Sequence, residues 1–336
     1  MTNSVIAPSA SIIWRLATTY RIDPAPLFAQ AGLNVSMQND PNARYDADAL
    51  NRVWQQVGEL VKNPCFGIRA GDHWHPSDLH ALGYAWLSSR NLRSSIERLC
   101  RYARIVTDVD DFTLVETDST VSLVVTNHGL PEDVVWIADS SLAVILSMCR
   151  VNLGEDFNPE SVSFIHSQPE CASDYYEYFR CPVVFNAVDN RINFATATVD
   201  TPLTGANAML AQVNDRIMID YLAKLNKNDV IQRVRAAIIE QLPSGHVTDA
   251  TVAATLNRNE RTLQRQLNNE GTTFKTLLNE IRTELASMYI QDSQLSLTEI
   301  SFMLGFSEIS SFSRAFKRWT GTSPSQYRQA FSGVQH

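Results

Sequence analysis

The chain has 336 residues, 44% of them apolar, which suggests two domains that each bury an ordinary core. No window reaches the roughly 18 uninterrupted apolar residues of a membrane helix, and the first residues lack the pattern of a signal peptide. We therefore expect a cytoplasmic protein with no membrane partner. The formal net charge of −8 argues against a uniformly basic nucleic-acid binder.

The first 200 residues alternate helical and strand patterns. Residues 47–61 and 91–106 carry apolar side chains at helical spacing. The β-branched and aromatic runs 112–116 and 121–126 flank a polar turn and predict a hairpin. Further along we expect a helix over 133–153 ending at Gly154, strands near 162–165, 183–185 and 192–194, and helices over 206–226 and 230–242. This order predicts an α+β domain with a small, mostly antiparallel sheet.

We place a domain boundary after residue 228, because residues 226–229 interrupt two helical patterns and no strand pattern follows. Residues 1–228 then form an α+β regulatory domain and residues 229–336 an all-helical one. The first part holds 17 basic and 26 acidic residues, the second 11 basic and 10 acidic. The acidity therefore belongs to the first part, and any DNA contact in the second must depend on where its arginines point.

The helical part contains a weak internal repeat at an offset of 48 to 50 residues. Val252-Ala253-x-x-Leu256 returns as Ile300-Ser301-x-x-Leu304, Leu263-x-Arg265-x-Leu267 as Phe312-x-Arg314-x-Phe316, and Gly271 as Gly321. Each copy predicts a short helix, a tight turn and a second helix, which is a helix-turn-helix unit.

Capping residues and exposed faces fit this interpretation. In the first copy we expect Asp249 and Asn259 to cap the two helices; in the second we expect Thr298 and Ser307 to do so, with Gly305 in the turn. The faces opposite the apolar positions carry side chains that read bases and phosphates in a major groove. They are Asn259, Arg261, Gln264, Arg265 and Asn268 in the first copy, and Ser310, Ser311, Arg314, Lys317 and Arg318 in the second.

A helix over 274–291 joins the copies, with its apolar residues at helical spacing. About 18 residues at 1.5 Å each give a strut of roughly 27 Å. Such a strut suits two recognition helices about one DNA turn, or ~34 Å, apart. One chain could then read two successive segments of the major groove.

At these residues the chain resembles the AraC/XylS transcription regulators. Their C-terminal signature is similar to a stretch of this chain that runs from Gly305-Phe306-Ser307-Glu308 through Ser311-Phe312-Ser313-Arg314-Ala315-Phe316-Lys317-Arg318-Trp319 to Gly321, Ser323-Pro324 and Tyr327-Arg328. Their first recognition helix is similar to Arg261-Thr262-Leu263-Gln264-Arg265. The resemblance covers about residues 230–331. The chain departs at Asn259, where serine is usual, and at Asn257-Arg258, a turn that often holds glycine and a hydrophobic residue.

The resemblance implies a sequence-specific regulator of promoter DNA, an activator that works with RNA polymerase. An enzyme is the rival interpretation, but the sequence has no G-x-S-x-G, no Gly-rich phosphate loop and no H-E-x-x-H motif, so we expect no enzymatic activity, cofactor or metal. Gln264 and Arg314 are the foremost base readers by this analogy. The first part is similar to a subgroup with an α+β sensor domain in place of a cupin barrel, on features such as Ala31-Gly32-Leu33, Leu82-Gly83-Tyr84 and Phe179-x-Cys181-Pro182. That likeness implies a small-molecule effector, such as an amino acid or a hydrophobic acid, and a domain able to form a homodimer.

Three alternatives remain open on the residues alone. The Asp72-His73-Trp74-His75 stretch with Asp78 and His80 could bind a metal, although a polar loop is the commoner outcome. The first part could be controlled by a protein partner instead of a ligand. A DNA-repair methyl acceptor on the same helical module would need a four-cysteine zinc cluster, and the five cysteines are too scattered for one. Neither a zinc site nor a disulfide framework is expected, so Cys65, Cys100, Cys149, Cys171 and Cys181 are predicted to be free thiols.

Overall fold

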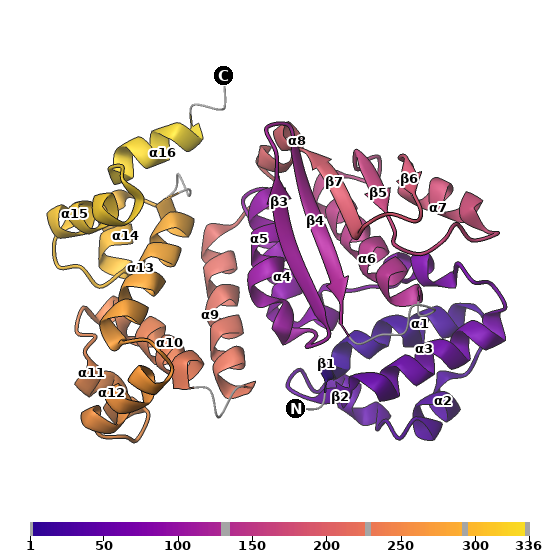
Figure 1. The fold of residues 1–336 in the computed structure, drawn as a ribbon, viewed down its shortest axis with the longest axis horizontal. Coiled ribbons are helices and arrows are strands. Elements are labelled where there is room, and N and C mark those ends of the chain that lie inside the picture. The colour runs from indigo at the N-terminus through magenta and orange to yellow at the C-terminus, as the bar shows by residue number, and fades with distance from the viewer. Residues whose placement is uncertain (1–2, 129–134, 226–229, 291–294, 333–336) are drawn as a thin grey trace. The chain divides into compact units, whose positions relative to one another are not determined.

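The computed structural model describes residues 3–128, 135–225, 230–290 and 295–332 (Figure 1). The chain folds into two compact units, Met1–Met218 and Ile219–His336. The expected boundary after residue 228 falls in a stretch outside the described residues. Strands and helices make up the first unit, and every element assigned in the described part of the second is helical, which confirms the expected fold class.

The first unit is built on a five-stranded sheet in the order β3-β4-β7-β5-β6 (Figure 1). Its strands are β3 (Asp110–Glu116), β4 (Thr120–Asn127), β5 (Ser161–Ser163), β6 (Val183–Val184) and β7 (Asn190–Ala195). The predicted hairpin is β3–β4, and only the β5–β6 pair is parallel. Leu123 of β4 lies opposite Ile192 of β7, and both are fully buried. A small, mostly antiparallel sheet is thus confirmed.

Helices and a two-stranded pair complete this unit. The helices are α1 (Ser11–Thr19), α2 (Pro24–Gln30), α3 (Ala47–Val61), α4 (His80–Ser88), α5 (Leu92–Tyr102), α6 (Trp136–Leu153), α7 (Ala172–Phe179), α8 (Thr196–Asp200) and α9 (Ala208–Leu225), which reaches into the second unit. The extra pair is β1 (Ser4–Ile6) with β2 (Arg44–Asp46). The start of α3 is set by Asp46, whose side chain accepts from the Ala49 N–H at 2.9 Å.

Helix α6 is the apolar centre of the first unit. By length and composition alone it could cross a membrane, but 56% of it is buried inside the protein. A helix that is apolar on all sides is typical of a buried core element as well as of a membrane span. It ends before Gly154, the predicted C-cap, whose φ of 101° and ψ of 156° place it in a positive-φ region open to glycine but outside the left-handed helical region. The predicted start at Asp133 lies outside the described residues.

The prediction of five free thiols is wrong for one pair. Cys65 and Cys171 form a disulfide, with Cα atoms 6.2 Å apart. Cys65 precedes the 3₁₀ segment η3 (Phe66–Asp72) and Cys171 precedes α7, so the fold brings together residues separated by 106 positions. Spacing along a chain cannot reveal such a pair. Cys100, Cys149 and Cys181 are free thiols.

The histidine-rich stretch forms a capped turn. The His75 ring accepts from the Ser77 N–H at 3.3 Å, and Asp78 accepts from the His75 N–H at 2.7 Å, closing a capping box on η4 (Pro76–Leu79). Asp78 also pairs with Arg15. The described residues contain no group of three His, Cys, Asp or Glu side chains placed to hold a metal ion.

The second unit consists of short helices around one long helix. After α9 come α10 (Val230–Gln241), α11 (Asp249–Thr255), α12 (Glu260–Asn269), α13 (Phe274–Ile290), α14 (Leu297–Met303), α15 (Ile309–Thr320) and α16 (Pro324–Ser332). A 3₁₀ turn, η6 (Leu242–Ser244), follows α10 and ends at Gly245 with φ 73°. Both predicted helix-turn-helix units are present, as α11–α12 and α14–α15.

Candidate nucleic-acid interface

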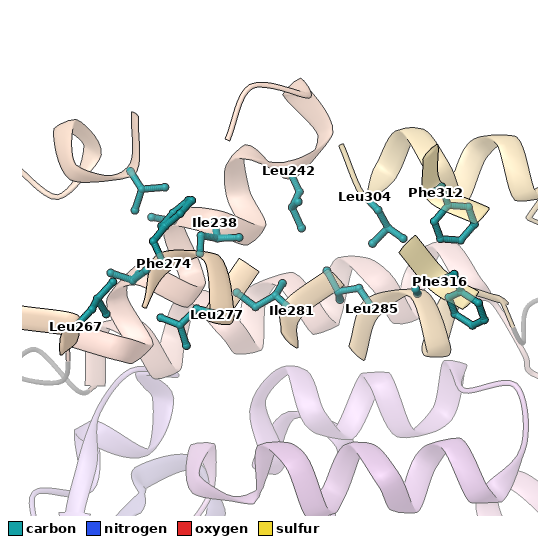
Figure 2. Close-up of a cluster of buried hydrophobic side chains, with 14 of the residues drawn as sticks. Ile238, Leu242, Leu267, Phe274, Leu277, Ile281, Leu285, Leu304, Phe312 and Phe316 are labelled. Atoms are coloured by element: carbon teal, nitrogen blue, oxygen red, sulfur yellow. The ribbon is translucent and has the colours of Figure 1, made fainter. Parts of the chain in front are cut away.

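One hydrophobic core holds the two helix-turn-helix units on the joining helix α13. Figure 2 shows its side chains in a row: Leu267 and Phe274 lie at one end, Leu277, Ile281 and Leu285 follow along α13, and Phe312 and Phe316 lie at the other end. The apolar residues at helical spacing in α13 thus face two partners in succession. The predicted end of this helix, Gln291, lies outside the described residues. Helix α13 as described has 17 residues, which at 1.5 Å each give a length of about 26 Å.

The two tight turns repeat bond for bond. The N–H groups of residues 256, 257 and 258 donate to the carbonyls of residues 252, 254 and 253, and those of residues 304, 305 and 306 to residues 300, 302 and 301, a shift of 48 in each case. Asn257 has φ 53° and Gly305 φ 72°, both in the left-handed region. Asparagine tolerates that region better than most side chains. Asn257 therefore replaces the usual glycine without altering the turn.

The first helix of each unit begins one or two residues earlier than predicted. The N-caps are Thr248 and Ser296, each in a capping box, with Thr251 and Glu299 respectively, so the expectation of Asp249 and Thr298 is wrong. Thr248 and Ser296 are also 48 residues apart. Each box satisfies N–H groups that the first turn of its helix leaves without a helical partner. The hydrogen bonds from Ser296 lower the pKa of Glu299.

The second helices start differently from one another. Asn259 caps α12 as predicted, because its Oδ1 accepts from the Thr262 N–H at 2.8 Å. In the second unit the N-cap is Glu308, not Ser307, and its side chain makes no capping hydrogen bond. The second turn is one residue longer, which moves the repeat from an offset of 48 to 49 between Leu263 and Phe312.

The exposed face of α12 gathers the predicted residues of the first unit. Asn259, Arg261, Gln264, Arg265 and Asn268 are all exposed and line one surface hollow together with Thr262 and Asn269. Leu263 and Leu267 are fully buried on the opposite side. The Gln264 amide donates to Asp249 at 3.0 Å and to Glu260 at 3.2 Å. Sequence reasoning did not foresee that acidic side chains hold the amide of this glutamine.

The exposed face of α15 carries the second set. Ser310, Arg314, Lys317 and Arg318 are exposed, and Ser311 is half-buried. Arg314 donates to the Ser311 hydroxyl at 3.4 Å, and Ser310 donates to Glu308 at 3.1 Å. Lys317 and Arg318 lie in the last turn, where cations also stabilise the helix. Phe312 and Phe316 face the core.

Arg282 of α13 is a positioning residue that sequence reasoning missed. Its Nε donates to the Leu304 carbonyl at 2.9 Å, its NH2 to the Gly305 carbonyl at 3.3 Å, and its guanidinium lies 4.5 Å from the centre of the Phe306 ring. Burial lowers the pKa of this arginine. It therefore caps the end of α14 and fixes the second turn to α13. The sequence feature that could have indicated this role is the single arginine of the 274–290 helix, which lies among its apolar positions.

Comparison with known proteins supports both units. Residues 22–203, more than half of the chain, match the family described as the arabinose-binding domain of AraC transcription regulator, N-terminal. Residues 252–330 match a helix-turn-helix domain. The latter range contains every residue predicted to contact DNA.

Similar regulators cover between 43% and 96% of this chain. The ornithine utilization regulator of Pseudomonas aeruginosa is 29% identical over 96% of this chain and 95% of its own length. The regulator VqsM of the same species is 26% identical over 79% of this chain and 84% of its own. The transcriptional activator NphR of a Rhodococcus species is 30% identical over 43% of this chain and 41% of its own.

Among solved structures, the transcriptional regulator CdpR of Pseudomonas aeruginosa has the same fold, with a TM-score of 0.50 and 22% identity over 95% of this chain and 98% of that one. The domain matches and the relatives are those of transcription regulators. The chain belongs to the AraC family of transcription regulators and joins an effector-type N-terminal domain to a DNA-binding helix-turn-helix domain.

Proposed function

We propose that this regulator binds promoter DNA with α12 and α15 in two successive segments of the major groove. The observation that carries the proposal is the repeat itself: identical turn hydrogen bonds, 48 residues apart, present two exposed polar faces from one shared core. Two unrelated surface helices would not be expected to follow turns with the same hydrogen bonds. The α13 strut of about 26 Å, plus the width of the flanking helices, suits segments ~34 Å apart.

Side-chain chemistry indicates which residues of each face contact bases and which contact phosphates. Arginine pairs with guanine and glutamine with adenine by two hydrogen bonds, so Gln264, Arg265 and Arg314 are assigned to bases. Lys317 and Arg318, together with Arg261, are assigned to phosphates, which position the protein without specifying sequence. Asn259, Asn268, Ser310 and Ser311 supply shorter polar contacts beside them. Asn259 keeps its Oδ1 on the helix N-terminus and offers only its amide N–H group.

Control of this DNA-binding domain is assigned to the first unit. A small metabolite is the expected effector, and the name of the 29%-identical relative connects that protein with ornithine utilization. We place the protein in the cytoplasm, acting as an activator that contacts RNA polymerase, and as a homodimer through the domain at residues 1–228, with residues 229–336 binding DNA.

The test is selection of bound fragments from genomic DNA by the full chain. We expect enrichment of a motif with two half-sites, centres about 10 base pairs apart, because two recognition helices on one face of the duplex require one helical turn. Binding should also weaken steeply with salt. Recovery of fragments with no shared sequence would refute specific recognition.

A further inference from the structure

The first unit contains a partly open cavity of about 170 Å³ that none of the DNA-binding features uses. Helices α3 and α6 form two of its walls, and residues of β1, α1, α4, α5, β3 and the adjoining turns contribute the rest of the lining. The contribution of α6 is one helical face at spacings of three and four: Ile137, Ser140, Ser141, Val144, Ile145 and Met148.

The size and lining of the cavity restrict what can occupy it. An engineered apolar cavity of ~150 Å³ accepts benzene, so this one accommodates a benzene-sized body with a short arm. Most of the lining is apolar, including Leu50, Trp54, Leu82 and Leu99. An apolar body therefore gains free energy by leaving water for this site.

The polar groups of the lining are of both kinds: the Asp110 carboxylate is an acceptor, and Asn51, Trp54 and Ser141 carry N–H or O–H donors. Asp110 at the start of β3 is the one acidic side chain among the described lining residues, and none of those residues is Lys, Arg or His. The Ser9 and Ser140 hydroxyls already donate to the carbonyls of Ile6 and Ile137 at 2.7 and 3.0 Å. Their oxygens therefore retain only lone pairs for a ligand.

Asp110 is held in place but not neutralised by a cation. The Asn127 amide donates to its Oδ1 at 2.6 Å, and Thr107 is its second hydrogen-bond partner. Two nearby basic side chains contact neighbouring carboxylates: His128 lies 2.7 Å from Asp111, and Arg44 lies 3.2 Å from Asp108. His128 also acts to lower the pKa of Asp110, against the larger effect of burial. Burial raises the pKa of the Asp110 carboxyl. A bound cation would relieve that cost of burial.

We propose that this cavity is the effector site and that it takes a small amine with an apolar body, the ammonium group facing Asp110. An ammonium group carries three N–H donors, which suit the Asp110 carboxylate and the lone pairs of the Ser9 and Ser140 hydroxyls. A carboxylate would bring a second negative charge beside Asp110 and find no cation in the described lining. The inference rests on the proposed function, in which the first unit binds an effector, and it disfavours the hydrophobic acids considered from sequence.

The test compares three ligands that share one ring: benzylamine, benzyl alcohol and benzoate. Calorimetry on the full chain at neutral pH should give benzylamine the highest affinity, about tenfold or more above benzyl alcohol, because charge-assisted hydrogen bonds are the stronger kind. Benzoate should bind most weakly. Benzoate binding as tightly as benzylamine, or failure of benzylamine to bind, overturns the proposal.

Two variants locate the site. Asp110→Asn should lower benzylamine affinity by about tenfold or more and leave benzyl alcohol affinity within about threefold, which also shows that the variant is folded. The matched control is Asp111→Asn, which removes the same charge from the next residue of β3 on the other face of the strand. If Asp111→Asn produces the loss and Asp110→Asn does not, the assignment of Asp110 is wrong.

A third variant tests the cavity itself. Val144→Phe places a ring in the space and should abolish binding of benzylamine and benzyl alcohol. Retained binding would place the ligand elsewhere. Binding of the selected promoter fragment is measured on the same preparations without ligand. If the unsubstituted protein binds this DNA but not benzylamine, the cavity assignment alone is overturned. If the unsubstituted protein does not bind DNA specifically, the proposed function is overturned.

Discussion

The two helix-turn-helix units share a turn but are held in different ways. In the second, a Cβ added at Gly305 would lie 2.6 Å from the Leu242 carbonyl oxygen, and Arg282 donates to the carbonyls of Leu304 and Gly305 in that turn. In the first, Asn257 takes the same backbone conformation and is exposed. The second turn is thus packed tightly between η6 and α13, while the first tolerates a side chain.

The reading faces differ in the opposite sense. On α12, the Gln264 amide is bound to two acidic side chains, and Asn259 is committed to the helix N-terminus. On α15, the hydrogen bond found for Arg314 among the described residues is a long one to Ser311, at 3.4 Å. The polar side chains of α12 must break hydrogen bonds within the protein before they can bind DNA. Those of α15 are less engaged, but the position of α15 depends on the turn that Arg282 holds. Equivalent residues of the repeat should therefore respond differently to equivalent changes.

The largest expected effect is on the second turn. Gly305→Ala should destabilise α14–α15 by about 2–4 kcal/mol, because the new methyl group meets a backbone carbonyl and the residue keeps a left-handed φ. The matched change Asn257→Ala should cost only the left-handed strain, about 1–2 kcal/mol. Hydrogen exchange of the amides in each unit measures the two losses separately. Equal losses would remove the distinction between the turns.

DNA affinity is the next test. Arg265→Ala and Arg314→Ala should each weaken binding to the selected site by about 1–3 kcal/mol and relax specificity at one half-site each. Arg233→Ala, an arginine of α10 outside both faces, is the control and should bind as the unsubstituted protein does. Two arginine variants that bind like the unsubstituted protein would refute the groove assignment.

A smaller effect is expected at the arginine that supports the second turn. Arg282→Met preserves much of the side-chain length but leaves the Leu304 and Gly305 carbonyls without these donors, which should cost about 1–2 kcal/mol. The loss should appear in the exchange of α14 and α15 amides and in binding to the second half-site. If α11 and α12 lose as much protection, Arg282 supports the whole core and not one turn.

The smallest predicted change is a gain. Asp249→Ala removes a carboxylate beside the Gln264 amide and should raise DNA affinity by about two- to threefold, an amount typical of one exposed charge. Fluorescence anisotropy with a labelled site at two salt concentrations measures it. A decrease in affinity would instead show that Asp249 holds Gln264 in its reading orientation.

Much of the DNA-binding domain follows from sequence because its signals are local. Helical spacing predicts α13, the repeat predicts the turns, and Asn259 has one obvious helix to cap. The caps at Thr248 and Ser296 were missed because Asp249 and Thr298 lie beside them with similar chemistry, and helix starts are uncertain by one or two residues. Chemistry alone does not choose between adjacent candidates.

The missing parts depend on contacts between distant residues. The Cys65–Cys171 disulfide spans 106 positions, and the contact of Gly305 with Leu242 joins the turn after α14 to the one after α10. The cavity draws its walls from residues between Val5 and Met148. Periodicity shows that a helix face is buried, but it does not show whether another side chain or an empty space lies opposite.

The most direct measurement of the central claim is affinity for a site with about five base pairs inserted between its half-sites, half a turn of the duplex. Because one rigid core holds both recognition helices, we predict that affinity falls to that of a single half-site. Arg265→Ala and Arg314→Ala should then no longer add their effects on that DNA. Undiminished affinity for the lengthened site would contradict this prediction. It would mean that α12 and α15 are not held at a fixed separation on one face of the DNA.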